Sequence, residues 1–446
     1  DRQVDAIHPG YGFLAERPDF ARLCQDAGIV FVGPPGEVLE AVTNRTEALS
    51  RVKAAGLPVV EHSPLLLEHY QHGETIPPQE IARHADRVGY PLVVKPERGG
   101  RGRGMCMVAS PDGLEQAVRR VLAYGEIVHA GGGLYLEKAI LPMRLLSVQV
   151  IAARPGEAIC LGEVESIVQR GSRRMIEEAP SPGVFSNQRE GLYQAARTIA
   201  GLFGYANIGA IEFLVNRSGQ PYFTEIKPRL QPEHPLTEMR TQVDLVAAQI
   251  RIAAGETVNL HPEISRQTGC ALMARIFIEG HKRNCQPASA FIRQFIPPSG
   301  PHVRVDTHLY TGCFAALDYD PLIAKLTVWG EDREACLLRL RCALGEWTLA
   351  WINTNLPYLQ SLLKTSDLSE GVTPEMVDQI GRSEASDADQ HSRELAAALA
   401  VAYTMRSRCF TPSLPARLIS GWHRNNRVPP KWAIGEVLYG QSGGRT

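Results

Sequence analysis

The segment Glu225-Ile-Lys-Pro-Arg229-Leu-Gln-Pro-Glu233-His-Pro235 follows an apolar run, and Glu212 precedes it within Asn207-Ile-Gly-Ala-Ile-Glu-Phe-Leu-Val215. Residues 208–215 and 222–226 are apolar and β-branched, and the polar residues between them include a glycine, which together predict a β-hairpin. With the turn centred on Ser218 and Gly219, Glu212 faces Glu225, and their Cβ atoms are expected roughly 4.5–5.5 Å apart. Two carboxylates at that distance favour a cation between them, and Mg²⁺ that also holds nucleotide phosphates is the usual one. An exposed hairpin end whose carboxylates splay into water is the alternative.

Arg229, Glu233 and His234 follow the second strand in a segment that contains three prolines. Because proline fixes φ and lacks a backbone N–H, we expect these side chains to be presented by a stiff, non-helical backbone. Polar loops at strand ends are common places for chemistry. The segment is therefore a candidate catalytic loop.

Composition bounds the class of protein. At 446 residues and 44% hydrophobic content, the chain can bury large cores and is expected to form two or more lobes. The net charge of −1 gives no overall field for nucleic acid or an anionic membrane, so neither is expected as a partner. The sequence holds no apolar run near the roughly 20 residues that span a bilayer.

The nine cysteines lack CxxC or CxxH spacing, so the sequence suggests neither a zinc site nor a disulfide framework. A reducing, cytoplasmic setting is the simplest interpretation. The chain begins at Asp1 without an initiator Met or a signal peptide and runs almost directly into a strand-like segment, so we expect its N-terminus to be cut.

Strand and helix patterns alternate along the first part of the chain, which indicates an α/β arrangement. The expected strands are 4–7, 29–32, 58–60, 92–95, 105–108 and 147–152, and the expected helices are 19–27, 37–55, 78–88, 111–123, 241–254, 332–345 and 356–365. A β-rich run is expected before Trp329, a linker over 366–390 and an Ala-rich helix over 392–403.

A glycine-rich loop, Lys95-Pro-Glu-Arg-Gly-Gly-Arg-Gly-Arg-Gly104, follows one of the expected strands. Repeated glycine lets backbone N–H groups approach phosphate oxygens while Lys95 neutralises charge. The loop lacks the Gly-Lys-Ser/Thr of a Walker A motif, and the next element is a strand, so it is not a good dinucleotide fingerprint either. A flexible, Arg-rich surface hairpin is the alternative.

These segments together resemble the biotin carboxylase family. The resemblance is collinear over roughly residues 1–365 and rests on the hairpin glutamates and on Ile7-His-Pro-Gly-Tyr-Gly-Phe-Leu-Ala-Glu16, Lys95…Gly102-Arg-Gly-Met105, Tyr135-Leu-Glu-Lys138, Ile176-Glu-Glu-Ala-Pro180, Glu233-His-Pro-Leu-Thr-Glu238 and Val303-Arg-Val-Asp-Thr-His-Leu-Tyr310. It implies an α+β ATP-grasp fold with an N-terminal lobe that lacks its beginning (1–65), a lid lobe (66–139), a β-rich C-terminal lobe (140–365) and a following region (366–446).

The resemblance implies ATP- and bicarbonate-dependent carboxylation of biotin held on a carrier protein. Glu212 and Glu225 would hold Mg²⁺ or Mn²⁺. Glu233 would be the general base toward bicarbonate, and Arg304 would stabilise the biotin enolate. Arg229 and Arg174 would hold bicarbonate, and the implied nucleotide contacts are Lys95, Gly99, Gly100, Gly102, Gly104, Glu137, Lys138, Gln169 and Arg45.

Several positions depart from the family pattern. Lys227 stands where the family usually has an asparagine metal ligand, and its spacing puts it on the strand face of Glu225. Its ammonium could therefore replace one of two magnesium ions or cap the carboxylates. The other departures are Arg45, Leu145, Ser147, Ser172 and Arg174, together with Arg98 and Arg101 in the glycine-rich loop.

Three functions remain open from the sequence. The first is an active biotin carboxylase component of an acyl-CoA carboxylase, dimeric, with a biotin carboxyl carrier and a carboxyltransferase as partners. The second is a degenerate, non-catalytic homologue that serves as a scaffold or regulatory subunit and still binds nucleotide. The third is another ATP-grasp ligase, which the retained Arg304 disfavours.

Overall fold

The computed structural model describes residues 4–66, 77–97, 104–127, 133–171, 173–184, 186–256, 258, 268–279, 289–317, 320–350, 352–365, 395, 398, 399 and 401. The chain divides into two compact units, Asp1–Gly381 and Arg382–Thr446. The four described residues of the second unit are helical and lie within the predicted Ala-rich helix. The predicted linker over 366–390 lies outside the described residues.

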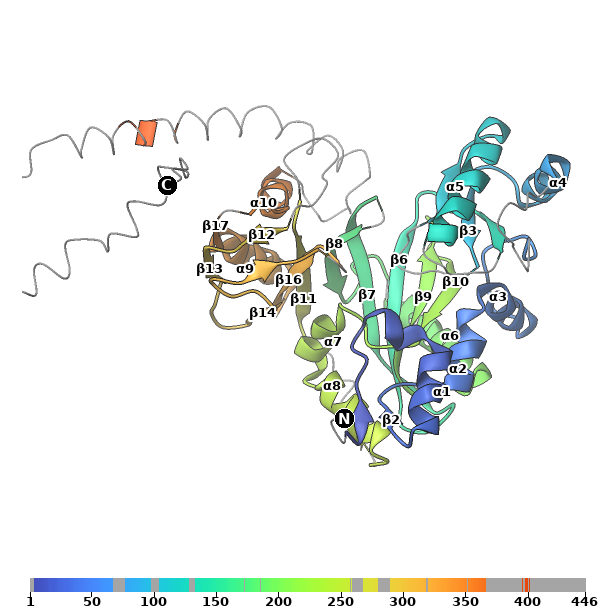
Figure 1. Cartoon of the computed structure of the whole chain (residues 1–446), viewed down its shortest axis with the longest axis horizontal. Helices are drawn as coiled ribbons and strands as arrows, with labels where there is room; N and C mark the ends of the chain where they lie inside the picture. Colours follow the sequence, from blue (N-terminus) through green and yellow to red (C-terminus); the bar gives the residue numbers. More distant parts are fainter. Residues whose placement is uncertain are drawn as a thin grey trace, which may run out of the picture. The chain divides into compact units, whose positions relative to one another are not determined.

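The first elements form a small α/β layer (Figure 1). Strand β1 (Ala6–Ile7) pairs in parallel with β2 (Val30–Phe31), and the 3₁₀ helix η1 (Phe13–Glu16) and α1 (Pro18–Asp26) connect them. The single helix predicted over 37–55 is wrong, because the structure has two helices, α2 (Gly36–Thr43) and α3 (Arg45–Ala54). Asn44 separates them, since its side chain accepts the backbone N–H of Glu47 and so begins a new helix.

A three-stranded antiparallel sheet carries the glycine-rich loop between two of its strands. Its order is β4 (Cys106–Val108), β3 (Leu92–Pro96) and β5 (Leu134–Lys138). The helices α4 (Pro78–Val88) and α5 (Leu114–Ile127) pack on it, the latter preceded by the 3₁₀ turn η2 (Pro111–Gly113) (Figure 1). Leu92, Val94 and Leu136 are fully buried and give these elements a core of their own.

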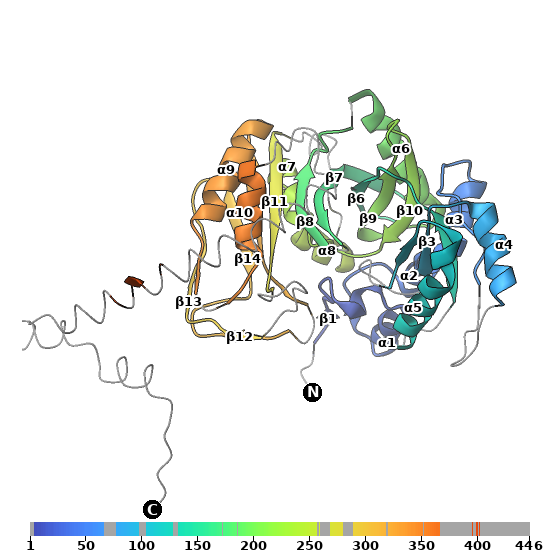
Figure 2. The same cartoon turned by 90° about the horizontal axis from the view of Figure 1, so that it is seen from above.

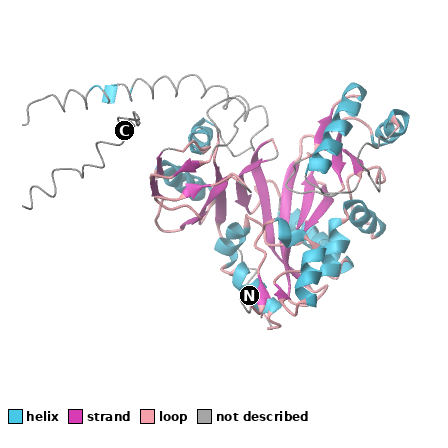
Figure 3. Cartoon of the chain, in the orientation of Figure 1, coloured by secondary structure: helices cyan, strands magenta, loops and turns pink. Residues whose placement is uncertain are grey.

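An eight-stranded antiparallel sheet forms the centre of the first unit (Figures 2 and 3). Its strands, in spatial order, are β10 (Pro221–Lys227), β9 (Asn207–Val215), β6 (Arg144–Ala152), β7 (Ala158–Arg170), β8 (Arg173–Ala179), β11 (Cys270–Phe277), β16 (Leu322–Gly330) and β14 (Val303–Thr307). Sequence patterns predicted neither β7 and β8 nor the helix α6 (Ser186–Leu202). Polar residues interrupt these segments, and their burial depends on partners distant in the sequence.

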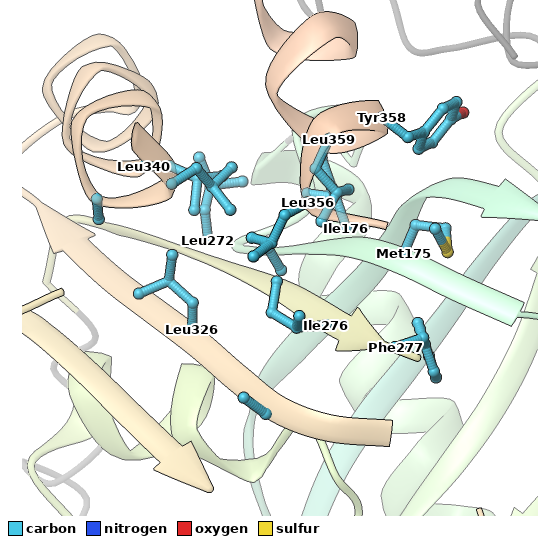
Figure 4. Packing of buried hydrophobic residues seen from close by; sticks show 14 of the residues in the cluster. Met175, Ile176, Leu272, Ile276, Phe277, Leu326, Leu340, Leu356, Tyr358 and Leu359 are labelled. Atoms are coloured by element: carbon cyan, nitrogen blue, oxygen red, sulfur yellow. The ribbon is translucent and has the colours of Figure 1, made fainter. Parts of the chain in front are cut away.

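The two faces of β11 pack against different helices. Leu272 and Ile276 point toward α9 (Arg333–Gly345) and α10 (Leu356–Thr365), as the close view of this core shows (Figure 4). Met273, on the opposite face, belongs to a separate cluster with Leu236 of α7 (His234–Thr241). Arg275 follows Met273 by two residues and therefore shares the α7 face. This face of the sheet carries the polar cluster described below.

Helix α7 ends at Thr241, and α8 (Leu245–Ala253) begins after Asp244. The helix predicted over 241–254 is therefore shorter at its start. Gln242 is left-handed, with φ of 60°, and the Asp244 side chain accepts the N–H of Ala247, so these residues form a break between helices. Two two-stranded sheets complete the described part, β12 (Ala290–Phe291) with β15 (Phe314–Ala315), and β13 (Gln294–Ile296) with β17 (Thr348–Ala350).

Candidate active site

The hairpin of β9 and β10 places Glu212 opposite Glu225, as the sequence predicted. The register differs from a simple hairpin near the turn, because Phe223 pairs with Phe213 while Glu225 pairs with Glu212. Thr224 is thus an extra residue on β10, and this β-bulge brings the two carboxylates into register. The turn contains Gly219 with φ of 81°, as expected.

Two cationic side chains contact one oxygen of Glu225. Lys227 Nζ lies 2.8 Å from Glu225 Oε2, and Arg45 Nη2 donates to the same oxygen at 3.0 Å. Arg45 sits at the start of α3 and also donates to the carbonyl of Pro96 at the end of β3. Burial alone would raise the pKa of Glu225, but the charges of Lys227 and Arg45 outweigh it and hold the pKa well below its usual range. Glu225 is therefore ionised at neutral pH.

Glu212 and Glu233 share a single guanidinium. Arg174 donates from Nη2 to Glu212 at 2.6 Å and from Nη1 to Glu233 at 2.9 Å. Ser147 adds a hydrogen bond of 3.2 Å to the same oxygen of Glu212. Glu212 and Glu233 are each 2% exposed, so the guanidinium compensates charges that water does not reach.

A second β-bulge directs Arg174 into this cluster. Val168 pairs with Ile176 and Gln169 pairs with Arg174, which leaves Met175 as an extra residue on β8. Strict alternation would put Arg174 and Glu177 on opposite faces of the strand. The bulge brings them to one face, where Arg174 Nη1 lies 3.7 Å from Glu177 Oε1.

Sequence reasoning missed Arg275, which holds the other oxygen of Glu233. Its Nη2 donates to Glu233 Oε2 at 2.9 Å, and its Nε donates to Glu177 at 2.7 Å. A lone arginine in the otherwise apolar run 270–277 signals a buried acidic partner, and that signal could have identified it. Burial would raise the pKa of Glu233, but Arg174 and Arg275 lower it below its ordinary value.

The prediction of a non-helical segment after β10 is wrong from His234 onward. His234 is the first residue of α7, Glu233 is its N-cap residue, and Pro235 lies in the first turn, where proline is tolerated. The carboxylate of Glu233 therefore lies at the positive end of a helix, which favours its ionised form.

Arg229 and Arg304 each engage a carboxylate of another element. Arg229 Nε donates to Glu16 of η1 at 2.5 Å, and although burial opposes it, this contact lowers the pKa of Glu16. Arg304 Nη1 donates to Glu238 of α7 at 2.6 Å. Glu238 also lies 3.1 Å from His234 Nδ1, so Arg304 is linked to the helix that follows Glu233.

Among the predicted nucleotide contacts, Lys95 and Glu137 form an ion pair across β3 and β5. Glu137 is 1% exposed, and its Oε2 has no hydrogen-bond partner within the described residues. Lys138 instead donates to the carbonyls of Gly89 and Tyr90 at 3.1 and 2.6 Å.

Of the predicted contacts in the glycine-rich loop, Gly104 lies within the described part of the chain. Gly104 has φ of 78°, and an added Cβ would lie 2.2 Å from the Tyr124 ring, so glycine is required there. Gly99, Gly100 and Gly102 lie outside the described residues, as does Ser172. Gln169 pairs with Arg174 in the sheet register.

The two hairpin carboxylates fit a hard divalent cation. Within the described residues, the hydrogen bonds of Glu212 fall on Oε1 and the close contacts of Glu225 fall on Oε2, so one oxygen of each carboxylate remains for a metal. The described part of the chain contains no group of three or more His, Cys, Asp or Glu that could hold a metal ion. A metal here would need ligands from a bound molecule as well.

Family models match most of the chain in three consecutive segments. They are the biotin carboxylase N-terminal domain over 1–39, the ATP-binding domain of the carbamoyl-phosphate synthase L chain over 41–261, and the biotin carboxylase C-terminal domain over 273–376. The biotin carboxylase of Nostoc is 40% identical over 372 residues, which cover 83% of this chain and 81% of that protein. The chain belongs to the biotin carboxylase family.

A subunit of one carboxylase and a domain of another are also similar to this chain. The alpha subunit of rice mitochondrial methylcrotonoyl-CoA carboxylase is 37% identical over 82% of this chain and 49% of that protein. The biotin carboxylase domain dimer of Hydrogenobacter thermophilus 2-oxoglutarate carboxylase, solved with MgADP, ADP and bicarbonate, matches with a TM-score of 0.78 and 34% identity over 84% of this chain and 81% of that one. The fold is therefore the α+β ATP-grasp fold of biotin carboxylases.

No helix among the described residues is long and apolar enough to cross a membrane.

Proposed function

We propose that this member of the biotin carboxylase family carboxylates biotin on a carrier protein, with ATP and bicarbonate as substrates. The observation that carries the proposal is the position of Glu233. Its carboxylate lies at the start of α7 with Arg174 on one oxygen and Arg275 on the other. A buried, ionised carboxylate beside a hairpin that fits a metal nucleotide can accept the proton of bicarbonate.

The arginines supply the charge that the reaction needs. Arg174 and Arg229 would hold bicarbonate by charge-assisted hydrogen bonds while Glu233 takes its proton. A bicarbonate oxygen would then attack the γ-phosphorus, and the bond between that phosphorus and the β,γ-bridging oxygen would break, so that ADP leaves and the phosphorylated bicarbonate forms. The ion pair with Glu16 of η1 fixes the position of the Arg229 guanidinium in the segment after β10. Arg304 would face the oxyanion of the biotin enolate, because a guanidinium stabilises negative charge without losing its proton.

We propose that the three-stranded sheet of β4, β3 and β5 binds the nucleotide together with the hairpin of β9 and β10. Lys95, Arg45 and the glycines of the lid loop would contact phosphates, and Glu137, Lys138 and Gln169 would complete the nucleotide site. Mg²⁺ or Mn²⁺, held by Glu212 and Glu225, would supply charge neutralisation at the phosphates. The lobes proposed for this arrangement are 1–65, 66–139 and 140–365, with a further region over 366–446.

We propose that the molecule that finally receives the carboxyl group from biotin is an acyl-CoA. The similarity to a methylcrotonoyl-CoA carboxylase alpha subunit supports this class, and the similarity to a 2-oxoglutarate carboxylase domain keeps a keto acid as the competing class. We further propose a cytoplasmic homodimer that works with a biotin carboxyl carrier and a carboxyltransferase. The Hydrogenobacter domain, described as a dimer, supports the dimeric state.

The test is bicarbonate-dependent ATP cleavage with free biotin. We expect biotin-stimulated ADP release from the wild-type chain and its loss in Glu233→Gln, which keeps the shape of the side chain but cannot accept the proton. Circular dichroism and thermal melting would show that the variant is folded. Equal ADP release from both proteins would overturn the proposal.

A non-catalytic scaffold is the second candidate, and one observation favours it. Both hairpin carboxylates are already paired with side chains of the protein, Glu225 with Lys227 and Arg45, and Glu212 with Arg174. Nucleotide binding without biotin-stimulated ADP release would support this candidate over the first.

A further inference from the structure

Lys227 is a buried cation in the middle of the proposed nucleotide site. It is 7% exposed, lies two residues after Glu225 on the same face of β10, and places Nζ 2.8 Å from Glu225 Oε2. A lysine ammonium loses much of its hydration at such a position, so it needs compensating negative charge. Glu225 supplies one such charge.

The charges around Glu225 do not balance within its own group of contacts. Lys227 and Arg45 both contact its single carboxylate, so these three side chains together carry one excess positive charge. The charge of Glu16 also acts on Lys227 and Arg45, but Glu16 is itself paired with Arg229, and Glu97 also interacts with Arg45. The charge of Lys95 on β3 also lowers the pKa of Glu225, but Lys95 is paired with Glu137 and adds no net charge here. The excess positive charge favours an anion here.

The neighbouring group has the opposite balance. Arg174 and Arg275 share three carboxylates, those of Glu177, Glu212 and Glu233. One end of the site is thus negative and suited to a metal ion, and the other is positive and suited to phosphate. This separation lies along the hairpin, between Glu212 on β9 and Lys227 on β10.

We propose that Lys227 binds the nucleotide phosphates directly and takes over part of the charge neutralisation that a divalent ion would otherwise provide. Glu225 then acts as a positioning residue that holds the ammonium in place through Oε2. Nucleotide binding by this chain is accordingly less dependent on metal than it would be with a neutral side chain at position 227. The inference rests on the proposed function for the identity of the ligand as a nucleotide.

A purely structural role for Lys227 makes a different prediction. If its ammonium only neutralised Glu225, its removal would change nucleotide affinity equally with and without metal. Direct binding to phosphate makes its removal more damaging when no metal shares the charge. The informative comparison is therefore between the loss of nucleotide affinity with metal and the loss without metal.

The experiment measures ADP binding by isothermal titration calorimetry with the full chain, once with saturating Mg²⁺ and once with EDTA. We compare the wild type with Lys227→Met, Lys227→Gln and Lys227→Arg. Lys53→Met serves as a matched control, because Lys53 has a side chain 58% exposed and pairs only loosely with Glu61, at 3.6 Å. Thermal melting of each variant reports folding.

We expect the wild type to bind metal-free ADP within about tenfold of its affinity for MgADP. A charge-assisted hydrogen bond contributes enough that Lys227→Met should weaken metal-free binding by about tenfold or more, with a smaller effect on MgADP. Lys227→Arg should restore most of the metal-free affinity, and Lys53→Met should change neither.

Two results would overturn the inference while leaving the proposed function intact. One is a loss of about a hundredfold or more in wild-type ADP affinity on adding EDTA, which needs no variant and so does not depend on how the variants fold. The other is an equal effect of Lys227→Met, or of Lys227→Gln, in both conditions. A wild-type chain that binds ADP in neither condition would overturn the nucleotide part of the proposed function as well. If the wild-type chain shows bicarbonate-dependent turnover and also gives either of the first two results, the proposed function stands and only the role of Lys227 is overturned.

Discussion

Arg174 donates from its two terminal nitrogens to carboxylates of different elements, Glu212 on β9 and Glu233 before α7. The forked guanidinium can reach both at once, whereas a lysine ammonium is a point charge on a flexible stem. Both carboxylates are nearly inaccessible to water, so each depends on a partner from the protein. The geometry of this one side chain therefore links the proposed metal ligand to the proposed base.

The substitution Arg174→Lys should lower the free energy of unfolding. It keeps the charge but removes the hydrogen bond from Arg174 to one of the two carboxylates, which retain the contact with Ser147 or with Arg275. A hydrogen bond to a charged group contributes about 1.5–3 kcal/mol. Urea unfolding would measure the change. Arg119→Lys is the control, because Arg119 pairs with Glu115 on an exposed helix face and should behave like wild type. Equal midpoints for all three proteins would contradict the prediction.

The acid sensitivity of the protein should depend on Glu238. Burial would raise its pKa, but the contacts with His234 and Arg304 lower it from 4.5 to about 2. A carboxyl with a lowered pKa in the folded state stabilises the protein above its unfolded pKa, and that stabilisation is lost as the pH falls through the folded value. The effect is therefore complete above about pH 4.5 and lost toward pH 2.

We expect Glu238→Gln to flatten this dependence. Denaturation midpoints measured at several pH values within that interval should fall less steeply for the variant than for wild type. Glu256→Gln, at an exposed carboxylate 3.9 Å from Arg251, should retain the wild-type slope. Parallel curves for Glu238→Gln and wild type would show that Glu238 contributes no acid-linked stability.

Helix α3 presents Arg45 to the hairpin, because Arg45 is its first residue. Asn44 caps it by accepting the N–H of Glu47 at 3.2 Å, and this cap also separates α3 from α2. The helical pattern across 37–55 is continuous in the sequence, so only the capping preference of asparagine marks the break.

The substitution Asn44→Ala should destabilise the protein by about 1 kcal/mol, since it removes the side-chain cap of α3. Thermal or urea unfolding would measure the loss. Thr43→Ala is a close control, because Thr43 is the last residue of α2 and its hydroxyl donates to the carbonyl of Glu40 within the same helix. An equal loss in both variants would indicate that the cap is not responsible.

Sequence patterns predicted the elements whose periodicity is local and missed those whose partners are distant. The hairpin of β9 and β10 follows from two apolar runs and one turn, so it was predictable, whereas the bulge at Thr224 that brings Glu225 opposite Glu212 was not. The contact of Arg275 with Glu233 joins residues 42 positions apart through the packing of α7 on β11. The apolar run around Arg275 signals a buried acidic partner, but nothing local identifies Glu233 as that partner. The bulge at Met175 is likewise invisible to a pattern of alternation.

Ion pairs between remote segments connect the layers of the first unit. Glu178 on β8 receives a bidentate contact from Arg333 at the start of α9, at 2.7 and 3.0 Å, across 155 residues of sequence. Glu178 is 1% exposed, and burial raises its pKa although Arg333 opposes the shift. The pair holds the helix that covers β11 and β16 against the sheet.

Removing Arg333 should therefore be costly at neutral pH. Breaking a fully buried pair from one side costs about 3–5 kcal/mol, because the remaining charge is uncompensated, and the cost here is smaller because the Arg333 side chain is 26% exposed. Urea unfolding of Arg333→Met at pH 7 would measure the loss, and Arg333→Met combined with Glu178→Gln should recover part of it, since the double variant has no unpaired carboxylate. A double variant no more stable than Arg333→Met would contradict this explanation.

The bulge at Thr224 also has a consequence for insertions and deletions. Because Phe223 pairs with Phe213 and Glu225 with Glu212, Thr224 is the one residue of this strand that the opposite strand does not match. A deletion of Thr224 would leave both pairs in register and every neighbouring side chain on its face of the sheet. A deletion of Ile226, three residues before Arg229, would instead turn Lys227 to the other face and separate it from Glu225. Length variation among related chains is therefore expected to be tolerated at position 224 and excluded at the position next to Lys227.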